Sequence, residues 1–509
     1  MARFEFTTSL PFAREEVFDW FSRPGALQRL TPPFSGSVRS EPDDGLQVGS
    51  TAMLGIGAPG GLGLGLGPAV GSVAGTLRLP GWARAEIPWR ARHVGLVPGR
   101  SFTDVMDSGP LDSWRHEHLF EDDGGGTLMR DTVTFTLPLA GTGGNGPWRR
   151  MAHWGEERFT AELQRMFEYR ERQLIGDLLF HARHRGTGAN TGSARSGRPG
   201  PSGLRIAISG SSGLIGTQLR ALLQGGGHDV MRLVRRPASA ADEIGWDPDA
   251  GRIDAQALAG CDAVVHLAGH PIGGRFTPAT KQRIMASRTA GTSLLARTLA
   301  DLSADGRRRS LVSGSAIGYY GASPQARRPG VPDLLVEDCP PGTDFLADVC
   351  AAWEASTVPA ARAGVRVATV RTGIVQSPAG GALQRMLPLF MAGLGGPLAG
   401  AGQQSWIGVD DCVSIFAHAV LDGQVDGPVN AVAPHPVDGA EYAATLARVL
   451  HRPAAVPVPG IGPALLLGAQ GAREIVQADQ RVSSRRIQSL GYEFREAELE
   501  RVLRHVLGR

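Results

Sequence analysis

The sequence predicts an α/β protein in which a doubly wound parallel sheet is preceded by an α+β module. The first observation is that strand-like and helix-like segments alternate from residue 204 onward: LRIAISG, a helix over Leu214–Gln224, then HDVMRLV and DAVVHLAG. This alternation is typical of parallel strands covered by helices on both faces. The second observation is that the residues before 186 contain mainly strand-like runs and one long amphipathic helix, as in a sheet packed against a helix.

Length and composition limit the possible classes of protein. The 509 residues correspond to roughly three to four domains. With 42% hydrophobic and 20% charged residues, the chain can bury enough apolar surface to fold, which excludes global disorder. A net charge of +3 is too small to concentrate a polyanion, so no nucleic-acid partner is expected.

Cysteine usage and the start of the chain bear on localisation. The cysteines form no CxxC pair, which argues against a zinc knuckle or a disulfide scaffold and favours a reducing compartment. The first residues lack the apolar stretch of a signal peptide, so a cytoplasmic protein is expected. The uncharged stretch between Asp44 and Arg78 is rich in glycine and contains two prolines. It predicts a loop rather than a membrane span.

Composition also divides the chain into segments. Residues 186–203, GTGANTGSARSGRPGPSG, contain nothing with which to build a core and predict a flexible linker. We therefore expect an α+β module at residues 1–185, an α/β domain at 204–455 and a small helical domain at 456–509.

In the first module, the strand-like run SWRHEHLFE places Trp114, His116 and His118 on one face, because side chains alternate along a strand. Two histidines could begin a metal site. No third ligand accompanies them at a diagnostic spacing, so we expect polar lining of a cavity and no metal.

The most informative motif is GSSGLIG, which follows the strand over Leu204–Ser209 and opens a helix. In such a motif the first glycine permits a tight turn, the second lets a pyrophosphate approach the backbone, and the third allows close helix packing. The helix N-terminus presents free amides to the anion. The motif predicts a nucleotide site at Gly210, Ser211, Ser212, Gly213, Leu214, Ile215 and Gly216.

Two further strand ends complete the predicted nucleotide site. The strand DVMRLV ends in Arg235 and Arg236, where an NAD-binding unit typically has an acidic residue. Guanidinium groups favour a 2′-phosphate, so NADP is preferred over NAD; the alternative is a solvated basic turn. In DAVVHLAG, the segment Leu267, Ala268 and Gly269, which includes two small residues, would let the dinucleotide pass close to the main chain.

The chain also contains the segments SGSAIGYYG, DFLADVCAAWE, VRTGIV and SWIGVDD. Together with the motifs above, these segments make the sequence from residue 204 to the end similar to atypical or extended short-chain dehydrogenases/reductases. The similarity is strongest to the epimerase-like family with a C-terminal domain of unknown function. The resemblance implies a Rossmann-type fold. The first module resembles the START-like (SRPBCC) ligand-binding superfamily. In that superfamily a sheet curls around a long C-terminal helix in a helix-grip fold and encloses an apolar cavity, which implies an apolar ligand.

The resemblance also implies catalytic residues. Relatives use a Ser for the substrate carbonyl, a Tyr as acid or base, a Lys that lowers the Tyr pKa, and an Asn on a preceding helix. Ser315 matches the Ser, and Arg288 stands at the expected position of the Asn. The segment DFLADVCAAWE lacks both Tyr and Lys. A proton could come from Tyr319 or Tyr320, with Arg288 or Lys281 as the cation; the alternative is that the tyrosines pack beside the nicotinamide.

Together these patterns predict an NADP-dependent oxidoreductase or nucleotide-sugar-epimerase-like enzyme acting on a small carbonyl or alcohol. The alternative is a non-catalytic NADP(H)-binding sensor or carrier, which the missing Tyr and Lys favour. We expect Cys350 to be a buried, inert thiol and His266 to be a packed core residue. Arg371 is expected either to meet an anionic substrate group or to form a structural ion pair. The oligomeric state stays open.

Overall fold

The computed structural model describes residues 1–57, 86–138, 147–185, 203–323, 334–397, 402–454 and 467–509. All but the last residue of the expected linker, 186–203, and most of the glycine-rich uncharged stretch lie outside these ranges. Among the described helices, none is both long and apolar enough to cross a membrane.

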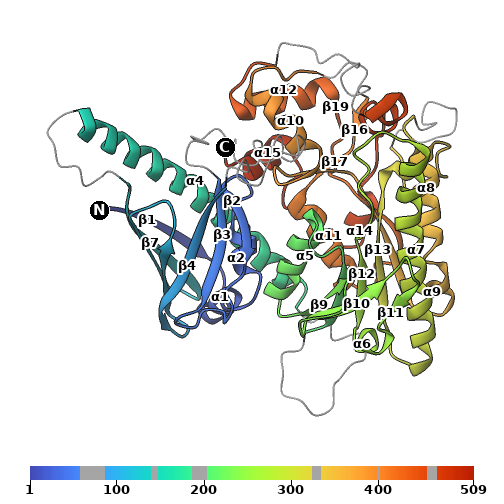
Figure 1. Cartoon of the computed structure of the whole chain (residues 1–509), viewed down its shortest axis with the longest axis horizontal. Helices are drawn as coiled ribbons and strands as arrows, with labels where there is room; N and C mark the ends of the chain where they lie inside the picture. Colours follow the sequence, from blue (N-terminus) through green and yellow to red (C-terminus); the bar gives the residue numbers. More distant parts are fainter. Residues whose placement is uncertain (58–85, 139–146, 186–202, 324–333, 398–401, 455–466) are drawn as a thin grey trace.

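The first module is an antiparallel sheet of seven strands in the order β1-β7-β6-β5-β4-β3-β2. Alternate residues of β6 and β7 are buried, most regularly in β7. The long helix α4 lies across this sheet (Figure 1). It buries the predicted apolar stripe, including Leu163, Phe167, Leu174 and Leu178. The elements are β1 (Ala2–Leu10), α1 (Arg14–Ser22), α2 (Ala26–Leu30), β2 (Gly36–Ser40), β3 (Thr51–Gly57), β4 (Glu86–Val97), β5 (Ser101–Ser108), β6 (Ser113–Asp123), β7 (Gly126–Thr136) and α4 (Pro147–Arg183).

The second module contains an eight-stranded sheet in the order β11-β10-β9-β8-β12-β13-β14-β18. The pairs from β10 to β18 are parallel, and β11 pairs antiparallel at one edge. The chain order reverses between β8 and β12. That switch point is where a doubly wound sheet leaves a crevice at the carboxyl ends of its strands.

Helices cover both faces of this sheet, as the alternation of its elements predicts. One apolar cluster joins the sheet to α5, α11 and α12, and another joins the opposite face to α6, α7 and α9. The strands are β8 (Arg205–Ser209), β9 (Asp229–Val234), β10 (Glu243–Asp247), β11 (Arg252–Ile253), β12 (Ala263–His266), β13 (Ser310–Ala316), β14 (Arg366–Thr372) and β18 (Gly427–Ala431). The helices are α5 (Leu214–Gly225), α6 (Ala255–Ala259), α7 (Pro278–Leu302), η5 (Ile317–Tyr320), α8 (Phe345–Ala355), α9 (Val358–Arg362), α10 (Gly381–Met391), α11 (Val409–Leu421) and α12 (Gly439–Leu450).

The C-terminal segment packs on the same core rather than on one of its own. Small strands pair nearby: β15 (Ile374–Gln376) with β17 (Trp406–Gly408), and β16 (Gln403–Gln404) with β19 (Val437–Asp438). Helices α14 (Arg485–Ser489) and α15 (Leu499–Leu507) add apolar side chains to the cluster that contains α11 and α12.

Candidate functional site

The glycine-rich turn joins β8 to α5 in a conformation that depends on its glycines. Gly210 has a φ of +69°, and a Cβ there would lie 2.9 Å from the backbone nitrogen of Ala268. A Cβ on Gly216 would lie 2.2 Å from the carbonyl oxygen of Gly210. Both distances are shorter than real Cβ contacts, so these glycines let turn, helix and β12 approach closely.

The N-terminus of α5 is suited to bind an anion. Gly213 is its N-cap and offers no side-chain cap. The Gly213 N–H donates to Gly210 O, and the first intrahelical donor is Thr217 N–H. The amides of Leu214, Ile215 and Gly216 therefore have no partner within the helix. Free amides and the helix dipole fit a pyrophosphate, so these residues could hold a dinucleotide.

A serine on β8 fixes the end of β12 beside this turn. The backbone amides of Leu267 and Ala268 donate to Ser209 Oγ at 3.1 and 3.3 Å, and Ser209 Oγ lies 2.6 Å from His266 Nδ1. His266 is buried, and burial lowers its pKa to about 3. It is the packed core histidine that we expected, and Leu267–Gly269 lie next to the turn.

Arg235 and Arg236, the two basic residues after β9, differ in their surroundings. Both are exposed. The Arg236 guanidinium forms two hydrogen bonds with the carboxylate of Glu243, the longer at 2.7 Å. That pair holds Arg236 against β10, whereas Arg235 forms no ion pair within the described part of the chain. Of the two arginines, Arg235 is therefore the one whose charge remains available to bind an anion.

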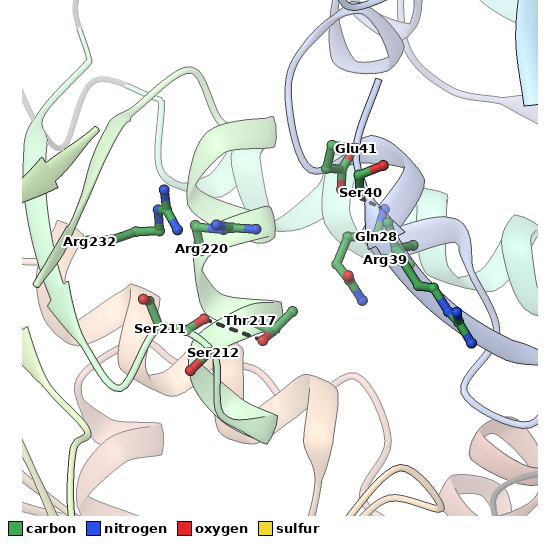
Figure 2. A pocket seen from close by; sticks show the side chains of 10 residues that line it. Gln28, Arg39, Ser40, Glu41, Ser211, Ser212, Thr217, Arg220 and Arg232 are labelled. Carbon is green, nitrogen blue, oxygen red and sulfur yellow. Dashed lines mark hydrogen bonds between the residues drawn. The ribbon is translucent and has the colours of Figure 1, made fainter. Parts of the chain in front are cut away.

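A cavity of about 220 Å³ lies between the glycine-rich turn and the first module (Figure 2). Ser211 and Ser212 line it, together with Arg220 of α5 and Arg232 of β9. From the first module it is lined by Gln28, Val38, Arg39, Ser40 and Glu41. Sequence reasoning missed Arg220, whose buried Nε has no hydrogen-bond partner among the described residues. Its place on α5, three residues after Thr217 and hence on the same helix face, could have indicated it.

At the end of β13, the predicted catalytic Ser315 is 4% exposed. Its hydroxyl donates to Glu354 Oε1 of α8 at 2.7 Å. Glu354 in turn accepts two hydrogen bonds of 2.8 Å from the Arg371 guanidinium. Glu354 was not predicted, although it lies in the segment where relatives have Tyr and Lys. Arg371 thus forms the structural ion pair that was one of its two expected roles.

The two tyrosines of η5 occupy different environments. Tyr320 is buried; it accepts a hydrogen bond from Arg371 Nη1 at 3.0 Å and donates to Asn430 Oδ1 at 2.8 Å. Burial raises the pKa of Tyr320 above its usual value. Tyr319 is less buried, and its ring centroid lies 3.5 Å from the Arg371 guanidinium carbon.

Arg288 of α7 lies beside Gly269 and Trp353. Its Nη1 donates to the carbonyl of His270 at 3.0 Å, and a Cβ on Gly269 would lie 3.4 Å from its Cζ. Its guanidinium stands 5.1 Å from the Trp353 ring centroid. Burial lowers the pKa of Arg288. Burial also raises the pKa of the neighbouring Cys350 thiol to about 12, in keeping with an inert thiol.

The sheet order, the switch point and the glycine-rich turn define a dinucleotide-binding fold. Comparison with known proteins agrees. Residues 206–431 match the NAD dependent epimerase/dehydratase family, and residues 458–506 match a domain of unknown function, DUF1731. An epimerase family protein of Mycobacterium bovis is 38% identical over 292 residues, which span 57% of this chain and 93% of that protein. The chain therefore belongs to the NAD dependent epimerase/dehydratase family.

Two solved structures resemble the chain over different lengths. A nucleoside-diphosphate sugar epimerase from Corynebacterium glutamicum has a TM-score of 0.74 and 32% identity, and covers 99% of this chain and 90% of its own. That likeness includes the first module. The human epimerase family protein SDR39U1, solved with NADPH, has a TM-score of 0.51 and 30% identity, and covers 60% of this chain and 99% of its own.

Proposed function

We propose that this chain binds NADP(H) at the carboxyl ends of β8, β9 and β12 and transfers a hydride to or from a small carbonyl or alcohol beside Ser315. One observation carries the proposal: the uncapped N-terminus of α5, with its glycine-rich turn, and Ser315 stand at the same edge of one parallel sheet. Parallel strands all present their carboxyl ends at that edge, so a dinucleotide held by the turn would lead toward Ser315.

The choice of NADP over NAD rests on charge. Arg235 is exposed after β9, and Arg220 and Arg232 line the cavity beside the turn together with Ser211 and Ser212. Guanidinium groups and hydroxyls are the donors that suit a phosphate. The human relative that was solved with NADPH supports the same choice.

When bound, a nicotinamide ring donates or accepts the hydride. The chain's own residues handle the proton. A substrate hydroxyl bonded to Ser315 Oγ would pass its proton to Ser315 while the Ser315 proton moves to Glu354 Oε1, 2.7 Å away. In the reducing direction the protons return by the same path. Tyr319 is the alternative proton source, and Arg288, beside Gly269, is the cation nearest the Leu267–Gly269 backbone.

The first module would hold a small apolar molecule, as START-like proteins do. Its support is the architecture, a curved antiparallel sheet closed by one long helix. Native mass spectrometry of the full chain as purified tests this idea. A copurified apolar guest would support it, and a first module that carries no guest after exposure to a panel of lipids and steroids would contradict it.

A pair of glycine substitutions tests the proposed cofactor site. In Gly216→Ala the new Cβ must displace the Gly210 carbonyl, so we expect at least roughly tenfold weaker NADPH binding, measured by fluorescence titration. Gly423→Ala is the matched control, because its Cβ meets nothing within 4 Å. Equal NADPH affinities in both variants would overturn the proposed site. Tight binding without turnover over a panel of carbonyls and nucleotide sugars would favour the non-catalytic sensor.

Cofactor choice has its own test in Arg235→Asp. A carboxylate at this position repels a 2′-phosphate and can accept from the ribose hydroxyls of NAD, so the ratio of NADH to NADPH affinity should rise by about tenfold or more. The two affinities are measured side by side in the same buffer. An equal effect on both dinucleotides would remove the reason for preferring NADP.

A further inference from the structure

Three strands of the first module place a group of histidines and aspartates on one face of the sheet. Asp104 of β5 pairs with His116 of β6 in the antiparallel register, and His118 of β6 pairs with Asp131 of β7. Residues two apart on a strand point to the same side, so both histidines of the HEH run meet aspartates from the flanking strands. The histidines and Asp131 are buried beneath α4.

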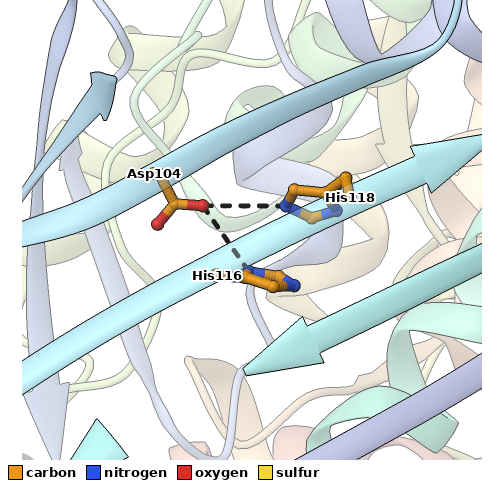
Figure 3. A group of neighbouring side chains, drawn as sticks. All are labelled: Asp104, His116 and His118. Atoms are coloured by element: carbon orange, nitrogen blue, oxygen red, sulfur yellow. Dashed lines mark ion pairs between the residues drawn. The ribbon is translucent and has the colours of Figure 1, made fainter. Parts of the chain in front are cut away.

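Three potential ligand atoms converge within this group (Figure 3). His116 Nδ1 lies 3.5 Å from Asp104 Oδ2, and His118 Nε2 lies 3.7 Å from the same oxygen. All three ligand atoms lie within 4.8 Å of one another. Around a zinc ion with bonds of about 2.1 Å, tetrahedral ligands stand about 3.4 Å apart. The two distances to Asp104 Oδ2 are close to that value.

Asp131 holds the two imidazoles from the opposite side. Its Oδ1 forms a 2.9 Å hydrogen bond with His116 Nε2 and lies 2.7 Å from His118 Nδ1. A carboxylate only accepts, so His116 carries its proton on Nε2 and turns the lone pair of Nδ1 toward Asp104. Histidines that bind metals are oriented in this way by a carboxylate on their other ring nitrogen.

We infer that Asp104, His116 and His118 form a binding site for a divalent transition-metal ion of the zinc class, with Asp131 as the carboxylate that orients His116 and contacts His118. The inference does not rest on the proposed function of the second module. Two neutral imidazoles and one carboxylate are the donors that suit such ions, and three protein ligands leave a fourth position open.

The surroundings indicate what would fill that fourth position. Arg170 and Glu171 of α4 line a cavity of about 10 Å³ together with Asp131. With neutral histidines, the carboxylates of Asp104, Asp131 and Glu171 balance the charges of Arg170 and a divalent ion. A cavity of this size holds about one water molecule, so water is the expected fourth ligand.

The experiment uses the full chain, produced without a metal-affinity tag, stripped with a chelator and titrated with Co²⁺. We expect about one tightly bound ion per chain, with the intense visible ligand-field absorption of a four-coordinate nitrogen and oxygen site, displaced by Zn²⁺. Elemental analysis after dialysis against micromolar Zn²⁺ gives the stoichiometry independently. Less than about a tenth of an ion per chain would overturn the inference.

Conservative variants locate the site. Asp104→Asn and His118→Gln keep the side-chain shapes and should each weaken Co²⁺ binding by at least roughly a hundredfold, whereas Asp131→Asn should weaken it by about ten- to a hundredfold. His435→Gln, at a histidine with a side chain 64% exposed, is the control and should leave the affinity unchanged. Circular dichroism shows which variants remain folded. Undiminished Co²⁺ absorption in a folded Asp104→Asn, His118→Gln double variant would also overturn the inference.

Discussion

At the scale of single residues, the hydroxyl of Ser315 is engaged by Glu354, and this contact bears on the proposed proton path. Ser315→Ala removes the donor to the substrate oxygen, so turnover should fall by about a hundredfold or more while NADPH affinity stays nearly unchanged. Glu354→Gln keeps the shape but accepts no proton, so turnover should fall.

Steady-state kinetics across pH measures both effects. Thermal unfolding monitors Glu354→Gln in particular, because the change also removes the ion pair with Arg371. The comparison variant is Tyr319→Phe. If it abolishes turnover while Glu354→Gln does not, the proton comes from the tyrosine, and the path through Ser315 is wrong.

The local part of this site could be predicted from the sequence, and the rest could not. The glycines of the turn stand at a fixed spacing directly between a strand and a helix, so the sequence reveals them, although Gly210 also meets the distant Ala268. Glu354, Arg220 and Asp104 meet their partners only after α8 packs on β13, α5 meets the first module, and β5 pairs with β6. For the histidines of the HEH run, the third ligand is Asp104 of the neighbouring strand β5. Its distance from them in the sequence is set by the hairpin between β5 and β6, and no motif records it.

At the scale of elements, four helices and the C-terminal segment meet around one buried guanidinium. Arg29 of α2 binds Asp177 of α4 through two hydrogen bonds of 2.8 Å, and also Asp410 of α11 at 2.9 Å and Gln218 of α5 at 2.8 Å. Arg495 adds a second cation to Asp177 at 2.8 Å. Burial disfavours these charges, but Arg29 nevertheless holds the pKa of Asp177 below its ordinary value.

Replacing Arg29 should therefore be costly. Arg29→Met leaves two buried carboxylates short of a partner, and the free energy of unfolding should fall by about 3 to 5 kcal/mol. Urea unfolding followed by circular dichroism gives the value. Arg3→Met removes an exposed ion pair with Glu5 and should change it by less than about 1 kcal/mol. If Arg29→Met also changed the free energy of unfolding by less than about 1 kcal/mol, water would be replacing the guanidinium.

The elements were predictable to different degrees. The alternating strands and helices of the second module follow from hydrophobic periodicity, and this alternation predicts a parallel sheet with helices on both faces. The ion cluster around Arg29 joins residues separated by up to 381 positions, and no local pattern records it. The α4 stripe was visible in the sequence, whereas the polar residue Asp177 on the same helix is bound by Arg29 of α2 and by Arg495, both far from it in sequence.

At the scale of the whole molecule, the two modules are joined by a buried interface that contains neutral histidines. The ring of His181, near the end of α4, packs against the first residues after α5: a Cβ on Gly226 would lie 2.9 Å from it. Arg23 of the first module donates to the carbonyl of Gly225 at 2.9 Å. Because α5 begins at the glycine-rich turn, this interface fixes the helix that would bind the dinucleotide phosphates.

Acid should loosen this interface through His181. Burial lowers its pKa to about 3 from an ordinary value of 6.5; nearby His228, Arg495 and Arg23 act in the same direction, and Asp177 opposes them. The unfolded chain therefore takes up the proton first as the pH falls. The contribution of a neutral His181 to stability is complete above pH 6.5 and is lost progressively toward pH 3, which amounts to about 2 kcal/mol by pH 5.

Other groups titrate in the same window, so the informative quantity is a difference between variants. Burial lowers the pKa of His228 to about 4, which adds to the acid loss, and raises that of Asp411 to about 6, which opposes it. Both effects are retained in His181→Gln. Between pH 7.5 and pH 5 this variant should lose about 2 kcal/mol less unfolding free energy than the unaltered chain, measured with urea. The exposed control His435→Gln should lose as much as the unaltered chain. If His181→Gln behaves like the control, His181 is already protonated or hydrated in the folded protein, and the interface does not respond to acid through this residue.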